Sequence, residues 1–246
     1  MVLFARFLAL PEEQMKLIDA YLNRGGPVMG LRTSTHAFKY EDQKSAYSKY
    51  DYRSETRGYE NGFGHQVLGQ TWVGHYGKNH IQSTRISIVP ELAGHPILRG
   101  VTDIHAQSGG YNAEPQLDWN ILTIAQPLMS MEIYGEPDAT KPPMASEWTR
   151  EYTGANGRKG RVFTSLYGAS EDILNPGYRR MILNAAYWLV GLEDEIKADA
   201  PIDFVGDYQP NTFGALSYAR GVKPEDYDGF ETPIPANHNT TDSGRK

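Results

Sequence analysis

Two apolar runs with a helical segment between them open the chain, and this arrangement constrains the fold more than any other feature of the sequence. Residues 2–7 and 27–31 each predict a buried strand. Residues 11–13 are Pro-Glu-Glu, which is typical of a first helical turn, and the glycines at 25–26 end the helix. Because a crossover through a helix returns the chain in the same direction, the two strands are predicted to be parallel in an α/β fold.

Later segments predict further strands and one long helix. The predicted strands lie at residues 85–89, 120–125, 128–134, 146–152 and 160–166. Asn175 and Pro176 form a strong helix start, with an N-cap followed by proline. Residues 39–66 are polar and rich in tyrosine, and they predict a long loop or an insertion. We therefore expect one domain at residues 1–195 and an extended tail at residues 196–246, which wraps the domain and is disordered at its end.

The composition narrows the classes of function. The 246 residues include no cysteine, which excludes a thiol nucleophile, disulfides and thiolate metal sites. The formal net charge of −6 argues against a nucleic-acid partner, because a phosphate backbone needs a basic face. No apolar run reaches the roughly 20 residues of a membrane span, so we expect no membrane partner.

Three segments carry a resemblance to a known family. They are residues 26–38 (Gly-Pro-Val-Met-Gly-Leu-Arg-Thr-Ser-Thr-His-Ala-Phe), residues 68–78 (Leu-Gly-Gln-Thr-Trp-Val-Gly-His-Tyr-Gly-Lys) and residues 160–191, which begin Gly-Arg-Val-Phe-Thr-Ser-Leu-Tyr-Gly-Ala. In content and order they resemble the ThuA-like (trehalose utilisation) domain family, which is related to the class I glutamine amidotransferases. The resemblance covers residues 1–195.

The resemblance implies a flavodoxin-like fold of three layers, as in class I amidotransferases, with a mainly parallel sheet. Family members usually begin with one more strand–helix–strand unit before the strand at residues 2–7. We therefore expect this chain to lack that first unit, either as a fragment or through a late start codon. An upstream piece could carry an export signal, so the sequence leaves the cellular compartment open.

Two positions argue against amidotransferase chemistry. In class I amidotransferases the turn after a strand like that at 27–31 presents a cysteine nucleophile, and a histidine near a later strand end activates it. By the resemblance, Arg32 and Ala169 stand at these positions, and neither side chain can take the role. We therefore expect no glutaminase activity. Thr33 or Ser34 could offer a hydroxyl nucleophile, but the G-x-S-x-G pattern of a serine elbow is absent.

The turn at Arg32 is still the best site candidate, because ligands of open α/β sheets gather at the carboxyl ends of parallel strands. Arg32 could bind an anion or a sugar hydroxyl, or pair with a buried carboxylate to fix the turn. His36 and His75 could orient or polarise a substrate, and Glu171 could move protons. These four residues are the predicted catalytic set. Alternatively, His36 and His75 hold a divalent metal ion or hydrogen-bond to loops, and Glu171 is an ordinary helix-end acid.

A second set is predicted to contact a substrate: Thr33, Trp72, Tyr76, Lys78 and Trp148. Aromatic rings would pack against the apolar face of a sugar, while polar groups bind its hydroxyls. For each ring, packing in the core or between loops is the alternative. The tyrosines within residues 40–59 could form a lid over the site or a surface insertion packed on the tail.

Two functions remain open from the sequence. The first is a sugar-processing enzyme that acts on trehalose, a related disaccharide or a keto derivative, with a divalent metal ion as the one cofactor considered. The second is a catalytically inactive amidotransferase-like module that binds a sugar or a partner protein. The missing cysteine and histidine favour the module, whereas the clustered His, Arg and Trp residues favour the enzyme. The expected ligand is a small-molecule carbohydrate, and a homo-oligomer is compatible with the sequence.

Overall fold

A mixed sheet of seven strands runs through the part of the chain that the structure describes, residues 1–206, 208 and 210 of a computed structural model. The strand order is β1-β2-β9-β8-β7-β4-β5. In this order the strands are β1 (Val2–Leu3), β2 (Val28–Leu31), β9 (Lys159–Ser165), β8 (Met144–Thr153), β7 (Asn120–Pro127), β4 (Thr84–Ile88) and β5 (Ile104–Ala106). A second, small sheet pairs β3 (His75–Tyr76) with β6 (Gly110–Tyr111).

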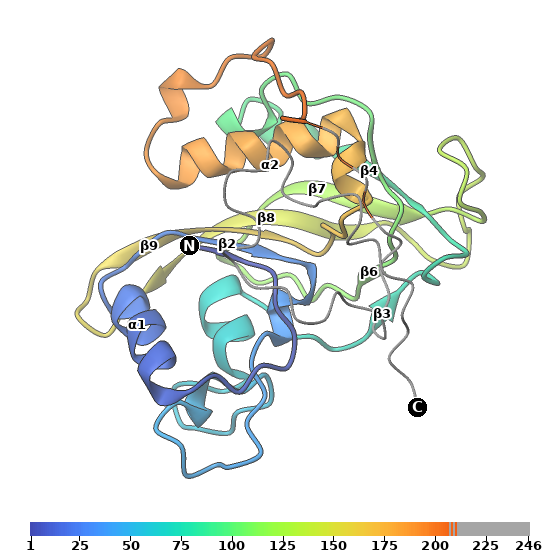
Figure 1. Ribbon diagram of the computed structural model, residues 1–246. Coiled ribbons are helices and arrows are strands. Elements are labelled where there is room, and N and C mark those ends of the chain that lie inside the picture. Colours follow the sequence, from blue (N-terminus) through green and yellow to red (C-terminus); the bar gives the residue numbers. More distant parts are fainter. Residues whose placement is uncertain (207, 209, 211–246) are drawn as a thin grey trace.

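Helices cover both faces of the main sheet (Figure 1). α2 (Pro176–Leu189) lies on one face, and α1 (Glu12–Asn23) lies on the other face beside the short helix η3 (Gly64–Leu68). The side chain of Asn175 caps α2 by accepting a hydrogen bond from the N–H of Tyr178. Both long helices therefore begin where the sequence predicts, and they complete the layers of an α/β fold.

Only one part of the main sheet is parallel. β1, β2 and β9 run parallel, with Val2 opposite Met29 and Met29 opposite Phe163, which confirms the strand–helix–strand unit at the start of the chain. From β9 to β5 every neighbouring pair is antiparallel. The prediction of a mainly parallel sheet is therefore wrong. The cause is connectivity, because a tight turn at residues 154–157 joins β8 to β9 and a parallel neighbour needs a long crossover.

Four of the later predicted strands are present, as β4, β7, β8 and β9. The strand predicted at residues 128–134 is absent, because after a single bridge between Leu128 and Pro137 the chain bends back on itself. The first strand ends early, at Leu3, and Phe7 has a φ of 53°, a left-handed conformation that does not fit a strand. The residues after β1 therefore turn across the edge of the sheet instead of extending it.

Apolar side chains pack on both faces of the main sheet. Phe163 and Tyr178 are fully buried in the core beneath α2, and Met15 and Tyr50 are fully buried in the core beneath α1. Residues 39–66 form the predicted long loop with short helical turns. Because tyrosines of this loop contribute to the core beneath α1, the loop is anchored to the domain.

The described part of the predicted tail contains no strand and no helix. It lies along α2, where the side chain of Arg179 donates to the carbonyl of Ile202 at 2.7 Å and the Tyr208 hydroxyl donates to the carbonyl of Ser170 at 3.0 Å. The end that the sequence predicts to be disordered lies outside the described residues. Among the described residues, no helix combines the length and apolar character that a membrane crossing requires.

Candidate functional site

The chain turns sharply directly after β2. Arg32 begins the short helix η1 (Arg32–His36) with a φ of 46°, in the left-handed region that costs a residue with a side chain about 1–2 kcal/mol. Since β2 and β9 are parallel neighbours, Arg32 and the fully buried Ala169 follow them at the same edge of the sheet. The two positions that the sequence singles out, Arg32 and Ala169, thus share one edge of the sheet.

The guanidinium of Arg32 is buried and fixed by hydrogen bonds. Its Nη1 donates to the carbonyl of Gly109 at 2.7 Å, and its Nη2 donates to Oδ1 of Asn79 at 3.3 Å. The same Oδ1 accepts the N–H of Gly109 at 3.1 Å. The guanidinium carbon lies 5.3 Å from the centre of the Tyr111 ring. Arg32 therefore joins the turn after β2 to the segment that contains β6, through a carbonyl and an amide.

His36 lies in the middle of a group of aromatic rings. Its ring centre is 5.1 Å from that of Phe7, 5.3 Å from that of Trp72 and 5.5 Å from that of Tyr111. Its Nδ1 lies 3.1 Å from Oγ1 of Thr35. Burial first, and then nearby positive charges, lower the pKa of His36 to about 4. His36 is therefore a neutral imidazole at physiological pH.

His75 stands on β3 at the exposed rim of the same group. Its ring centre is 5.6 Å from that of Trp72 and 5.4 Å from that of Tyr111, which is its partner residue on β6. Partial burial, followed by the positive charge of Arg32, lowers the pKa of His75. The indole N–H of Trp72 is buried and has no hydrogen-bond partner among the described residues. The site thus contains the neutral imidazole of His36 and the indole N–H donor of Trp72, which has no partner among the described residues.

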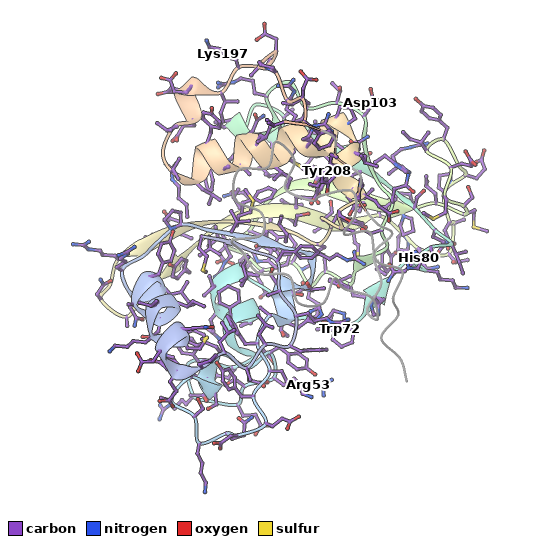
Figure 2. All side chains as sticks on the ribbon, in the orientation of Figure 1. Arg53, Trp72, His80, Asp103, Lys197 and Tyr208 are labelled. Carbon is purple, nitrogen blue, oxygen red and sulfur yellow. The ribbon has the colours of Figure 1, made fainter. Side chains whose placement is uncertain are left out.

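We call Phe7, His36, Trp72, His75 and Tyr111 the aromatic site. It lies on the α1 side of the main sheet, where Figure 2 labels Trp72. The structure brings together four residues that the sequence nominates: Arg32, His36, Trp72 and His75. Phe7, Tyr111 and Asn79 were missed. One signal for Tyr111 is the preceding Gly110, at which a Cβ atom would lie 2.5 Å from the Tyr167 hydroxyl.

Three other predicted residues lie around this site without joining its rings. Thr33 is half-buried in η1. Tyr76 directs its hydroxyl to the carbonyl of Pro142, where it donates a hydrogen bond. Lys78 is exposed, and its backbone N–H donates to the side chain of Gln82 at 3.1 Å. The burial and hydrogen bonds of these three residues do not by themselves assign any of them a role in binding.

Trp148 belongs to the core, so its prediction as a substrate-binding residue is wrong. It has no exposed surface, and its ring stacks on Trp119 with 3.9 Å between the centres and 2° between the planes. Its indole N–H donates to the carbonyl of Leu68 at 2.8 Å. Because the ring has no exposed surface, a ligand has no access to it.

Glu171 lines a hollow that includes none of the rings of the aromatic site. Glu171 is half-buried and lines a hollow of about 240 Å³ together with His105 and Leu174. The neighbouring Asp172 is fully buried, and one of its oxygens accepts the backbone N–H groups of Gly168 and Ala169, each at 2.9 Å. Asp172 therefore holds the turn after β9 in place.

The metal alternative finds no ligand set in the described chain. Within residues 1–206, 208 and 210, no group of three or more His, Asp or Glu side chains is arranged to hold a metal ion. His36 and His75 share the aromatic site, but the remaining neighbours of His36 are rings and a threonine hydroxyl. These two imidazoles therefore do not form a metal centre with the residues around them, since a protein metal site needs three or four ligands.

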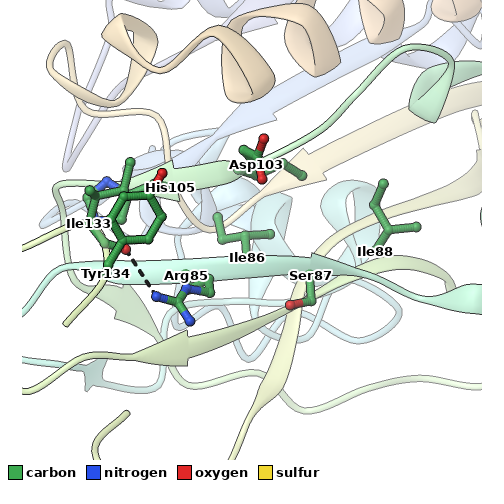
Figure 3. Close-up of a pocket in the computed structure, with 9 residues that line it drawn as sticks. Arg85, Ile86, Ser87, Ile88, Asp103, His105, Ile133 and Tyr134 are labelled. Carbon is green, nitrogen blue, oxygen red and sulfur yellow. Dashed lines mark hydrogen bonds between the residues drawn. The ribbon is translucent and has the colours of Figure 1, made fainter. Parts of the chain in front are cut away.

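A hollow of about 300 Å³ lies elsewhere, along β4 and β5 at the opposite edge of the sheet from β1 (Figure 3). Arg85 and His105 face each other across these strands, and Ile133 and Tyr134 lie next to His105. Arg85 donates to the carbonyl of Ile133 at 3.2 Å. The aromatic site is therefore distinct from this hollow and depends on its partly exposed rings for access.

No family model matches the sequence, and no curated protein matches it. Two solved crystal structures of proteins named as ThuA-like are similar to this chain. The protein from Bacteroides uniformis is matched over 80% of this chain and 71% of its own length, with a TM-score of 0.47 and 13% identity. The protein from Parabacteroides merdae is matched over 77% of this chain and 69% of its own length, with a TM-score of 0.43 and 16% identity.

The chain matches ThuA-like proteins in structure. The roles of individual residues rest on the geometry of this chain alone.

Proposed function

We propose that this chain is a ThuA-like protein of carbohydrate utilisation, that it binds trehalose or a related sugar at the aromatic site, and that it is not a glutaminase. One observation carries the proposal: partly exposed rings of Phe7, Trp72 and His75 converge at the carboxyl end of parallel strands. Rings with a few fixed polar groups are the usual lining of small-molecule sites.

The polar groups of the site suit a hydroxylated ligand. The buried indole N–H of Trp72 has no partner among the described residues, and an unpaired buried donor costs about 1–3 kcal/mol. A sugar hydroxyl that accepts this hydrogen bond would relieve the cost. His75 is exposed at the rim and is held neutral by the lowered pKa of its ring, so it can accept a proton from a second hydroxyl.

Sugar processing would then rest on His75 as the general base. In the proposed step the ring of His75 takes a proton from a sugar hydroxyl or from the carbon beside a keto group, and the electron pair stays on the sugar. The charge of Arg32, which already lowers the pKa of His75, stabilises the developing negative charge. Thr33 and Lys78 remain candidate binding residues, whereas Glu171 lies with His105 and Leu174 and has no part in this step.

A catalytically inactive amidotransferase-like binding module is the second candidate. The hydrogen bonds of Arg32 favour it, because its guanidinium donates to Gly109 and Asn79 at the turn after β2. Ala169 adds no reactive group at the adjoining strand end. In this case the aromatic site binds a sugar or a partner without turnover.

Titration of the purified protein with disaccharides tests both candidates. Binding of trehalose and of its keto derivative is measured by calorimetry, and turnover is followed by NMR with and without divalent metal ions. His75→Ala should abolish turnover and leave weak binding, because the rings of Phe7 and Trp72 remain. His65→Ala, which removes a half-buried histidine on η3, serves as the control. Binding without turnover would establish the module, and no binding of any sugar would reject the proposal.

A further inference from the structure

Positive charges surround the outer rings of the aromatic site. The guanidinium carbon of Arg6 lies 5.7 Å from the ring centre of Phe7, and Nζ of Lys39 lies 6.0 Å from the same centre. Arg32 lies beneath, beside Tyr111 at 5.3 Å. Both Arg6 and Lys39 are exposed, and neither forms an ion pair with a carboxylate in the described part of the chain. This concentration of cations stands out in a chain whose net charge is −6.

The backbone holds Arg6 and Lys39 on the same rim. The N–H of Phe7 donates to the carbonyl of His36 at 3.0 Å, and the N–H of Lys39 donates to the carbonyl of Leu8 at 3.0 Å. Leu8 also forms a parallel bridge with Phe38. The two segments are therefore joined along their length, and both cations lie within about 6 Å of the ring centre of Phe7, a residue that is 40% exposed.

The electrostatic field inside the aromatic site is also positive. The pKa of His36 is lowered by burial first, and then by the charges of Arg6, His75 and Arg32. Burial raises the pKa of Tyr111, while Arg32 and Arg6 oppose that rise. Arg6 and Arg32 are thus the two permanent cations that act on both groups. Lys39 also lines a neighbouring hollow whose lining includes the carboxylates of Glu41, Asp51 and Glu55.

We propose that the ligand of the aromatic site carries an anionic group, a carboxylate or a phosphate, which Arg6 and Lys39 bind above Phe7. This inference rests on the proposed function, and it narrows the substrate class from sugars in general to acidic or phosphorylated sugars. Arg6 and Lys39 lie near the same ring and repel each other, and an anion that both bind offsets that repulsion. Charge-assisted hydrogen bonds from a guanidinium and an ammonium then fix its orientation.

A matched series of sugars tests the inference. Binding of glucose, glucuronate, glucose 6-phosphate and inorganic phosphate to the wild-type protein is measured by calorimetry at low and high salt. We expect the charged sugars to bind at least about tenfold more tightly than glucose at low salt, the effect of one good charge-assisted contact, and to lose this advantage at high salt. The comparison of glucuronate with glucose 6-phosphate distinguishes a carboxylate from a phosphate ligand.

Variants separate the subsite from general electrostatics. Arg6→Gln should weaken binding of the charged sugars about tenfold and leave glucose binding unchanged. Lys197→Gln removes an exposed cation on the α2 side of the sheet (Figure 2) and should change neither. Thermal unfolding confirms that both variants are folded.

Each outcome decides one of the two proposals. Equal binding of glucose and the charged sugars would overturn the anion subsite and leave the sugar site standing. Equal binding of inorganic phosphate and glucose 6-phosphate, both weakened in Arg6→Gln, would support the anion subsite and reject sugar recognition. If neither phosphate nor any sugar binds, the proposed function fails, and the anion subsite fails with it.

Discussion

The guanidinium of Arg32 donates a hydrogen bond of 2.7 Å to the carbonyl oxygen of Gly109, and this bond joins the elbow after β2 to the start of β6. Tyr111 on β6 pairs with His75 on β3, so the bond also fixes the two sides of the aromatic site relative to the elbow. Asn79 strengthens the link by accepting from both Arg32 and Gly109. Arg32 therefore acts as a structural clamp between the turn after β2 and the two sides of the aromatic site.

Two substitutions at Arg32 can measure the backbone strain in the turn after β2. Arg32→Ala and Arg32→Gly both lose the hydrogen bonds to Gly109 and Asn79. Alanine retains the left-handed φ of 46° with a side chain, whereas glycine adopts it freely, so Arg32→Ala should be less stable than Arg32→Gly by about 1 kcal/mol. Urea unfolding at pH 7 gives both values. Equal stabilities, or the reverse order, would show that the elbow is not strained.

The two tryptophans of the predicted substrate-binding set should separate by stability. Trp148→Ala should cost about 3–5 kcal/mol, because it removes a fully buried ring that stacks on Trp119. Trp72→Ala should cost less than about 2 kcal/mol, because that ring is partly exposed. Urea unfolding monitored by circular dichroism measures both. If Trp72→Ala lost more stability than Trp148→Ala, the assignment of Trp148 to the core and of Trp72 to the partly exposed site would be wrong.

Local sequence patterns predict most elements of this fold. Both long helices follow from their start signals, and the parallel start follows from the run of strand, helix and strand. The mainly parallel sheet was wrong because β7, β8 and β9 follow one another without a helix between them, and the strand signals carry no direction. Short strands such as β3 and β6 have too few residues to show a period.

The candidate site was predictable only in part. Arg32, His36, Trp72 and His75 stood out by residue type within the family-like segments, and the structure brings them together. Tyr111 joins them through a two-residue pairing between segments far apart in the chain, which no local pattern encodes. Trp148 and Trp72 differ in burial and not in sequence context, so composition alone could not assign one to the core.

The pH dependence of stability should report the neutral state of His36. Because the folded pKa is about 4 and the unfolded pKa is near 6.5, the unfolded state takes up a proton first as the pH falls. Stability is therefore fully present above pH 6.5, and it declines between 6.5 and about 4, by up to about 3 kcal/mol from this residue.

A variant isolates this contribution from the other histidines. His36→Gln cannot take up the proton, so its free energy of unfolding should fall less steeply than that of the wild type over this interval. His65→Gln, outside the site, should follow the wild type. Urea unfolding at several pH values between 7 and 4 measures all three proteins. A His36→Gln curve parallel to the wild type would mean that His36 is accessible to protons in the folded state.

We expect the buried Glu147 to make stability fall as the pH rises above about 4.5. Its carboxyl is fully buried on β8, where the hydroxyl of Ser165 donates to it at 2.7 Å and that of Thr123 donates to its other oxygen. Burial raises the pKa of Glu147 above its usual value of 4.5, although these hydrogen bonds oppose the rise. The folded state therefore holds the proton more tightly than the unfolded state, and stability falls as the pH rises from 4.5 through the folded pKa.

Glu147→Gln should remove this decline, because the amide has nearly the same shape and does not ionise. The stability of the variant relative to the wild type should therefore increase as the pH is raised from 4.5 to 8. Glu151→Gln, which changes an exposed carboxylate on the same strand, provides the control and should follow the wild type closely. Urea unfolding across this range measures the three proteins. A constant difference between Glu147→Gln and the wild type would show that the buried carboxyl does not change its charge there.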